Sequence, residues 1–129
     1  MIAIGIGARS GVTADEICEA ILKTEMAAGE RAHVIATFAE AAFHDSACEA
    51  AARAATPFQS LTLAELRQRS GDCTTRSERS LAVHGVGSIS EAAALAAAGP
   101  NSRLIVPRVV SGAVTAAAAM SKDHREVAT

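Results

Sequence analysis

The sequence contains almost no aromatic side chains, with three Phe and neither Trp nor Tyr among 129 residues. Because single-stranded nucleic acids are bound by stacking bases on aromatic rings, this scarcity argues against that function. Basic residues are not in excess either, since 12 Lys and Arg stand against 14 Asp and Glu. We therefore expect no nucleic-acid partner and no binding to an acidic membrane surface, both of which require a basic face.

The three cysteines form no C-x-x-C pair and have no His at the spacing of metal ligands. We expect free thiols in a reducing compartment, with no metal site and no cofactor. Cys18 and Cys48 are expected on the apolar faces of helices, as small buried hydrophobes. Cys73 lies in a polar stretch and is the thiol that we expect to be reactive.

The chain has no pattern of a signal peptide or of a membrane span. An apolar segment starts at Ile2, which leaves no room for a basic region before it, and alanine-rich runs such as 92–98 are too short to cross a bilayer. These observations predict a cytoplasmic protein without a membrane partner.

Half of the residues are hydrophobic, but alanine dominates that half, so the core is expected to be thin and closely packed. A length of 129 residues suits one domain with a substantial core. The pattern of elements predicts an α/β protein: a single three-layer α/β/α domain over residues 1–120, followed by a polar C-terminal tail over 121–129. The sheet is expected to be mixed and mostly parallel, with a C-terminal β-hairpin.

The segment Ile2–Glu16, IAIGIGARSGVTADE, reads as a buried strand, a glycine-rich turn and a helix start. Thr13 and Glu16 fit a capping box, so the helix amides and Arg9 together suit a carboxylate or phosphate. The glycines miss the dinucleotide fingerprint by one residue, and the Lys of a P-loop is missing. The alternative is a tight turn that requires glycine for backbone reasons alone.

Further elements follow from periodicity and capping signals. We expect helices at Ala14–Ala28, Ser46–Ala55, Leu63–Arg69 and Ser88–Ala98, and strands at His33–Ala39, Phe58–Leu61, Leu81–Gly87, Leu104–Val110 and Ala113–Met120.

The carboxyl end of the second predicted strand brings Glu40, His44 and Asp45 near the first loop. Glu40 and His44 are the candidate catalytic acid/base residues, although Asp45 alternatively only caps the following helix. The segment Ser70–Ser80 has no periodicity. It is expected either to be a solvated loop or to close over an anion with arginines such as Arg79.

Three motifs resemble the cobalamin-biosynthesis family that comprises CobE and the C-terminal domain of CbiG. They are GIGARSGVTADEI at 5–17, GVGSISEAAAL at 85–95 and LIVPRVVSGAVTAAAA at 104–119, in that order. The resemblance covers nearly the whole chain and implies the free-standing CobE type. It also implies a small α/β/α domain that acts in the corrin-ring part of vitamin B12 synthesis.

Two positions depart from this family's pattern. Members often have Cys where this chain has Ala8, and Lys where it has Arg108. An obligatory thiol at the first loop is therefore not expected, and Arg108 keeps a positive charge but cannot form a Schiff base. For the CbiG type the resemblance implies opening of the ring-A lactone of a cobalt-precorrin. For the CobE type it implies a pathway role without a fixed reaction.

Precorrins carry many carboxylates on an apolar macrocycle, so a binding site needs arginines, exposed amides and an apolar surface. We expect the two glycine-rich helix starts, 5–13 and 85–88, to share one groove. Its expected ligand-binding residues are Gly7, Arg9, Ser10, Gly11, Thr13, Gly87, Ser88, Glu91, Arg108, Ser111 and Thr115.

Three functions remain open at this point. The protein binds or passes on a precorrin or corrinoid intermediate, or it is an enzyme that opens a precorrin lactone, with Glu40 or His44 as the base. Alternatively it is an assembly module for another enzyme of the B12 pathway.

Overall fold

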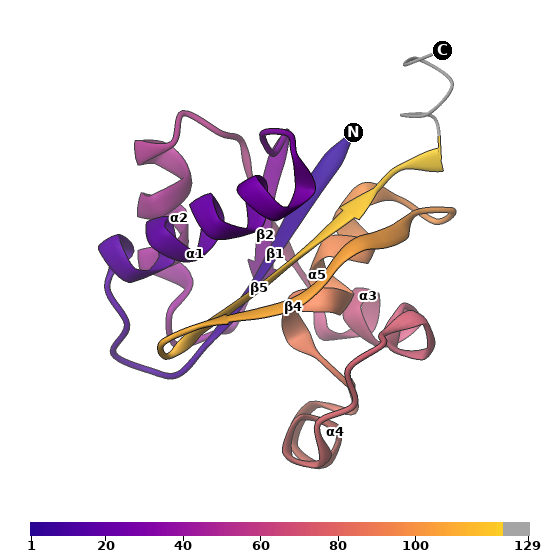
Figure 1. Cartoon of the computed structure of the whole chain (residues 1–129). Coiled ribbons are helices and arrows are strands. Elements are labelled where there is room, and N and C mark those ends of the chain that lie inside the picture. The colour runs from indigo at the N-terminus through magenta and orange to yellow at the C-terminus, as the bar shows by residue number, and fades with distance from the viewer. Residues whose placement is uncertain (123–129) are drawn as a thin grey trace.

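The computed structural model describes residues 1–122, and these form a five-stranded sheet covered by helices on both faces (Figure 1). The strands are β1 (Ile2–Ala8), β2 (Val34–Phe38), β3 (Phe58–Leu61), β4 (Arg103–Ser111) and β5 (Val114–Met120). The helices are α1 (Ala14–Ala28), α2 (His44–Arg53), α3 (Leu63–Gln68), the 3-10 turn η1 (Ser70–Asp72), α4 (Glu78–His84) and α5 (Ile89–Ala98).

The sheet has the strand order β3-β2-β1-β5-β4 and is mixed, as expected. β1 pairs in parallel with β2, and β2 with β3, whereas β5 runs antiparallel to both β1 and β4. Two pairings are therefore parallel and two antiparallel. The predicted C-terminal hairpin is confirmed, and its turn contains Gly112 at φ 61°.

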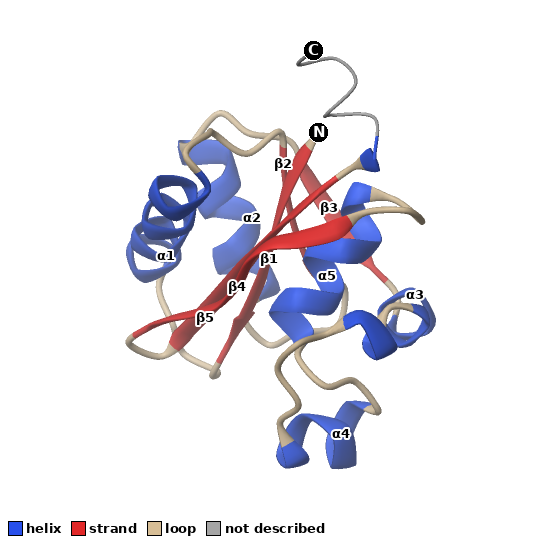
Figure 2. Cartoon of the chain, turned by 45° about the vertical axis from the view of Figure 1, so that its right-hand side comes forward, coloured by secondary structure: helices blue, strands red, loops and turns tan. Residues whose placement is uncertain are grey.

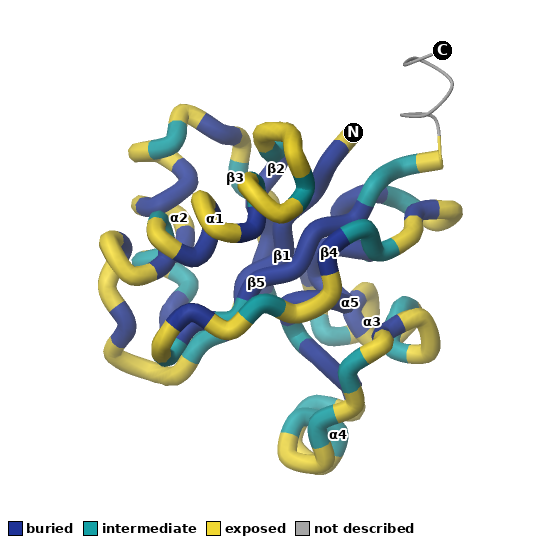
Figure 3. Tube along the Cα trace, viewed as in Figure 1, coloured by how far each residue is buried: buried dark blue, intermediate teal, exposed yellow. Residues whose placement is uncertain are grey.

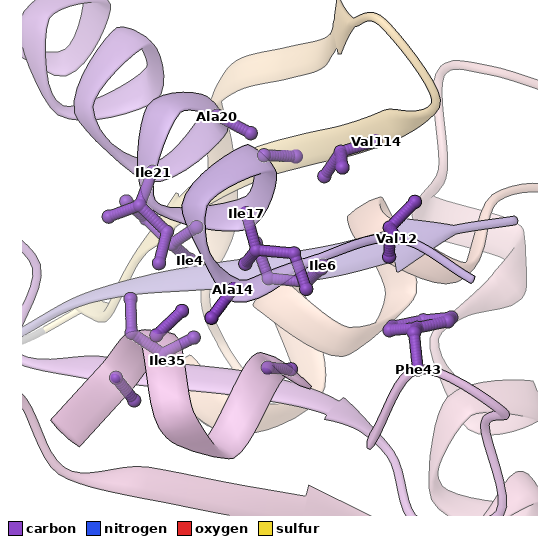
Figure 4. Close-up of a cluster of buried hydrophobic side chains, with 14 of the residues drawn as sticks. Ile4, Ile6, Val12, Ala14, Ile17, Ala20, Ile21, Ile35, Phe43 and Val114 are labelled. Carbon is purple, nitrogen blue, oxygen red and sulfur yellow. The ribbon is translucent and has the colours of Figure 1, made fainter. Parts of the chain in front are cut away.

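One core lies between the sheet and the pair α1 and α2 (Figure 4). It is filled by the isoleucines of β1 and α1, which are completely buried at Ile4, Ile6 and Ile17. The second core lies on the other face, where α5 and α3 cover the sheet (Figure 2). This arrangement is the three-layer α/β/α domain that the sequence predicts.

The alanine content has a direct consequence for the second core. α5 contributes Ala92, Ala93 and Ala94, all fully buried, so its backbone approaches the sheet closely. A Cβ atom on Gly5 of β1 would lie 2.0 Å from the carbonyl oxygen of Ser90. Gly5 is therefore a packing requirement inside the strand and does not belong to a turn.

For two elements, the predicted first and last residues both agree with the structure. α1 and β3 have the predicted bounds, and the capping boxes at Thr13 and Thr62 are both formed. Gly29 ends α1 in the left-handed conformation, as a C-terminal glycine should.

The region 70–87 was predicted wrongly. The expected structureless loop contains η1 and the start of α4, and the expected strand Leu81–Gly87 is the end of α4 and the turn after it. Ser77 accepts a hydrogen bond from the amide of Ser80, and Gly85 takes the left-handed conformation at the other end. These two caps define a helix, so the apolar content of 81–87 was misread as a strand.

One smaller prediction was also wrong. α2 begins at His44, and Phe43 precedes it without a side-chain cap, so Asp45 does not have the expected capping position. In α1, Leu22 is 58% exposed, whereas Thr24 is buried. The C-terminal tail expected over 121–129 lies outside the described residues from 123 onward.

Within the described part of the chain, no single helix is long and apolar enough to cross a membrane. Only α4 and α5 taken together, as a pair bent by 64°, reach that length and composition.

Candidate functional site

An open groove of about 800 Å³ lies beside the carboxyl end of β1. Its floor comes from β1, β5 and the start of α5, while the turn after β1, α4 and β4 supply its sides. The lining residues are Gly7, Ala8, Arg9, Ser10, Ser77, Arg79, Ser80, Val83, His84, Ser88, Ile89, Arg108 and Thr115.

The groove is basic. Arg9, Arg79 and Arg108 reach it from three different segments, and none of the described residues that line it is Asp or Glu. All three arginines are exposed to solvent. The start of α5 adds the partial positive charge of a helix N-terminus beside Ser88. An anion with several negative charges is therefore the ligand that the groove suits best.

α4 forms a wall that stands apart from the body of the domain, as Figures 1 and 3 show. None of its residues is buried. It is held at its two ends: the amide of Ser77 donates to the carbonyl of Gly87 at 2.9 Å, and Arg67 Nε donates to the carbonyl of His84 at 2.9 Å. These bonds fix where α4 begins and ends relative to α5.

The groove is also lined by Arg108, which lies in an irregular part of β4. The pairing of β4 with β5 shifts between Val106 and Val109, so Arg108 has no partner residue in the ladder. A bulge of this kind turns a side chain away from the direction it would take in a regular strand. The backbone amide of Arg108 is instead bonded to the carboxylate of Glu91 at 2.9 Å.

Glu91 is completely buried at the third position of α5. Burial alone would raise its pKa, but bonds from the Thr75 amide, the Arg108 amide and the hydroxyls of Thr75 and Thr74 outweigh it. Together they hold the pKa of Glu91 below its ordinary value. Glu91 is therefore an ionised carboxylate inside the protein.

The structure brings six of the predicted ligand-binding residues together in the groove: Gly7, Arg9, Ser10, Ser88, Arg108 and Thr115. Ser10 and Ser88 open on the same cavity, so the expected common groove is present. The reason for it differs from the expected one, because the segment before Ser88 is a helix and a turn, not a strand. Binding by these residues stays a prediction.

The other predicted ligand-binding residues have structural tasks away from the groove lining. Ser111 lies on the far face, where Lys23 Nζ donates to its hydroxyl at 3.2 Å. Thr13 caps α1, and Gly11 makes the turn before it at φ 86°. Gly87 is required for packing, since a Cβ there would lie 2.9 Å from the Thr75 carbonyl. Glu91 faces inward, as described above.

The two catalytic candidates are separated. Glu40 lines a smaller cavity of about 200 Å³ that shares Gly7, Ala8, His84 and Ile89 with the groove. His44 lines neither cavity: its Nε2 lies 2.7 Å from the hydroxyl of Ser60, and its ring meets Phe58 edge to face. The structure thus does not join Glu40 and His44 in one site.

Sequence reasoning missed the α4 contribution of Ser77, Ser80, Val83 and His84. The available signal was Ser77 followed by Glu78, an N-cap with an acidic first turn. Of the arginines in or beside 70–80, Arg79 does reach the groove. Arg69 instead binds the C-terminal end of α5 through the carbonyls of Leu95 and Gly99.

The cysteines also differ from expectation. Cys48 is exposed, not buried, and Cys18 is half-buried. Cys73 is buried, and burial, together with the charge of Glu91, raises its pKa to about 11. The thiol expected to be reactive is therefore protonated and shielded. The described residues contain no group of His, Cys, Asp and Glu that could hold a metal ion.

Comparison with known proteins identifies the family. The family model described as cobalamin synthesis G C-terminus matches residues 2–119. No protein with a curated functional description matches the chain.

Two solved structures are similar. The cobalamin biosynthesis protein ChiG from Agrobacterium tumefaciens str. C58 is 37% identical, with a TM-score of 0.79 over 95% of this chain and 100% of that one. The crystal structure of CobE, a protein from the cobalamin (vitamin B12) biosynthetic pathway, has the same fold at 23% identity. Its TM-score is 0.84 over 92% of this chain and 89% of that one. The chain thus belongs to the cobalamin synthesis G C-terminal family, and with it to cobalamin biosynthesis.

Proposed function

We propose that the groove binds a precorrin or other corrinoid intermediate of cobalamin biosynthesis through the carboxylates of that intermediate. The observation that carries this proposal is the convergence of Arg9, Arg79 and Arg108 on a groove without acidic lining residues among those described. Guanidinium groups bind carboxylates through paired, charge-assisted hydrogen bonds. Three of them on different segments suit a ligand whose acids are spread around a ring.

The apolar and neutral parts of the groove support the same ligand class. Ala8, Val83 and Ile89 offer an apolar surface for a macrocycle, and a volume of about 800 Å³ is large enough for a ligand of drug size or more. The hydroxyl of Ser80 is buried and has no hydrogen-bond partner among the described residues. Since a buried hydroxyl is normally paired, rotation of the Ser80 side chain toward the groove that it lines would give this hydroxyl a carboxylate acceptor from the ligand.

A binding role fits these observations better than a hydrolytic one. Among the described residues that line the groove, His84 is the only one with an imidazole or carboxyl side chain, and arginines do not act as bases. The second candidate, an enzyme that opens a precorrin lactone, has one observation in its favour. Glu40 and His84 line the smaller cavity that adjoins the groove, so a carboxylate and an imidazole border one space.

The binding proposal is tested by titrating cobyrinic acid, a corrinoid with free side-chain carboxylates, and following its absorbance. Cobinamide, whose corresponding side chains are amides, is the matched ligand control. We expect a Kd of about 1 μM or lower for cobyrinic acid, and binding at least about tenfold weaker for cobinamide. Added salt should weaken the binding of cobyrinic acid and leave the binding of cobinamide nearly unchanged.

Absence of an absorbance change up to millimolar protein would overturn the binding proposal, as would equal affinity for the two corrinoids. Incubation with a lactone-bearing precorrin separates the enzyme from the carrier. An enzyme releases an opened product over many turnovers, whereas a carrier returns the compound unchanged.

A further inference from the structure

The carboxylate of Glu91 connects two segments, one that leads into the groove-lining residues of α4 and one that contains Arg108 of β4. Its Oε1 accepts from the Thr75 amide at 2.9 Å. Its Oε2 accepts from the hydroxyls of Thr74 and Thr75, at 3.0 and 2.9 Å, and from the Arg108 amide at 2.9 Å. One buried side chain on α5 thus holds the segment before α4 and the bulge of β4 at once.

This arrangement differs from ordinary helix capping. Ser88 accepts from the Glu91 amide, which is half of a capping box, but the Glu91 carboxylate is used elsewhere. In the capping boxes at Thr13 and Thr62, by contrast, the glutamate side chain returns to the cap amide. The helix start does not require this use of Glu91, so its four bonds need another explanation.

All four groups donate to the carboxylate, and two of them, the backbone amides of Thr75 and Arg108, can only donate. These two amides face different oxygens, so the NH2 group of a glutamine would face one of them, whereas an ionised carboxylate accepts from both. The charge of Glu91 is therefore needed for the geometry, and a side chain of the same shape does not replace it.

The two segments carry side chains that line the groove. The segment 74–75 leads into Ser77, Arg79 and Ser80, and Arg108 contributes its own side chain. Glu91 itself does not line the groove and is fully buried. Its effect on a ligand must therefore pass through the residues that it holds.

We propose that Glu91 is a positioning residue, which sets the separation between α4 and Arg108 and so the spacing of the anion-binding groups. The inference rests on the proposed function of the groove. According to this inference, Glu91 determines which spacing of ligand carboxylates the groove accepts, although Glu91 itself does not contact the ligand.

The test is a double-mutant cycle between Glu91→Gln and Arg108→Ala, with cobyrinic acid as the probe. We expect Glu91→Gln to weaken binding about tenfold or more. In the double variant the loss should be clearly smaller than the product of the two single losses, because Arg108 is already misplaced. A residue that only stabilises the domain would give losses that multiply.

Amide hydrogen exchange measures, without any ligand, the clamp that Glu91 forms between residues 74–75 and Arg108. In Glu91→Gln we expect faster exchange at Thr75, Arg108 and the α4 amides, while the amides of β1 and α1 keep their protection. Glu65→Gln, at the same helix position in α3 and away from the groove, is the matched control and should change neither exchange at these sites nor binding. Thr75→Val removes one donor and serves where Glu91→Gln does not fold.

Multiplying losses, or unchanged binding in both Glu91→Gln and Thr75→Val, would overturn the proposal. If the wild-type protein does not bind cobyrinic acid, the proposed function fails instead. The exchange rates at Thr75 and Arg108 then still decide whether Glu91 holds the two segments: unchanged rates reject the clamp, and faster rates support it.

Discussion

Gly5 of β1 and Ser90 of α5 lie so close that a Cβ on the glycine would be 2.0 Å from the serine carbonyl oxygen. The same Cβ would lie 2.5 Å from the Ala94 amide nitrogen. Backbone atoms cannot yield as the end of a flexible side chain can. The contact sets the distance between α5 and the sheet, and with it the place of Ser88 at the groove.

We expect Gly5→Ala to destabilise the fold by about 3 kcal/mol, at the upper end of the range for overpacked cores. Chemical denaturation followed by circular dichroism measures this change. Gly71→Ala is the control, because a Cβ there meets nothing within 4 Å and the backbone has no positive φ. A Gly5→Ala protein as stable as Gly71→Ala would mean that α5 does not approach β1 in this way.

How far the sequence predicts this fold depends on whether the signals are local. Both bounds of α1 were predicted correctly, because Thr13 and Glu16 mark its start in the sequence and Gly29 marks its end. The region 81–87 failed because Val83 and Val86 suggest a strand, and only Gly85 with the distant Ser77 defines the helix. Competing local preferences of equal strength are resolved by packing, which the sequence does not display.

The positive charge of the candidate site could be predicted from the sequence, but the segments that enclose the groove could not. Arg9 and Arg108 were found from loops and motifs, and both line the groove. Ser111 was misplaced because a strand residue faces one side or the other of the sheet, and the bulge near Arg108 changes the alternation. Glu91 was taken for a ligand contact, since nothing in a capping box reveals that the carboxylate turns to Thr75.

The arginines of the groove should contribute separately to binding. We expect Arg9→Ala and Arg108→Ala each to weaken the binding of cobyrinic acid by about 1.5–3 kcal/mol, the range of hydrogen bonds to charged groups. Isothermal titration calorimetry measures the change. Arg103→Ala is the control on the same strand as Arg108, because Arg103 is exposed and is not among the groove-lining residues, and its guanidinium donates to the sulfur of Met120. Full affinity in either groove variant would remove that arginine from the site.

Arg69 is expected to act on stability and not on binding. Its guanidinium donates to the carbonyls of Leu95, Gly99 and Ser102 and to the hydroxyl of Ser102, at 2.7 to 3.1 Å. Arg69→Ala removes these charge-assisted hydrogen bonds, although the Leu95 and Gly99 carbonyls keep other donors, and should lower the free energy of unfolding by about 3 kcal/mol. Cobyrinic acid should still bind to the folded variant with unchanged affinity, and a large loss would place Arg69 in the site after all.

The three thiols should react in the order of their exposure. We expect iodoacetamide at pH 8 to label Cys48 first, and Cys73 only after unfolding, because burial raises the pKa of the Cys73 thiol to about 11. Mass spectrometry of peptides at successive times measures the order. Rapid labelling of Cys73 in the native protein would show that the segment 73–77 opens, and the clamp by Glu91 would then be weak.

The stability of the domain should depend on pH through Glu91. Its pKa is held below the ordinary value of a glutamate by the hydrogen bonds that it accepts, so the folded state favours the ionised form. A group of this kind contributes stability above its unfolded pKa and loses that contribution as the pH falls through its folded pKa. We expect wild type to exceed Glu91→Gln by about 1.5–3 kcal/mol at pH 7, from the loss of charge-assisted hydrogen bonds.

Below pH 4 the advantage of the wild type should shrink, because protonation of Glu91 puts a hydroxyl among the donors from Thr74, Thr75 and Arg108. Urea unfolding of the two proteins at intervals from pH 7 to pH 2.5 measures the difference, in which the contributions of carboxyls common to both proteins cancel. A difference that stays constant over this range would mean that the pKa of Glu91 is the same in the folded and the unfolded protein. The bonds of Glu91 to residues 74–75 and to β4 would then not depend on its charge, and Glu91→Gln would bind cobyrinic acid like the wild type.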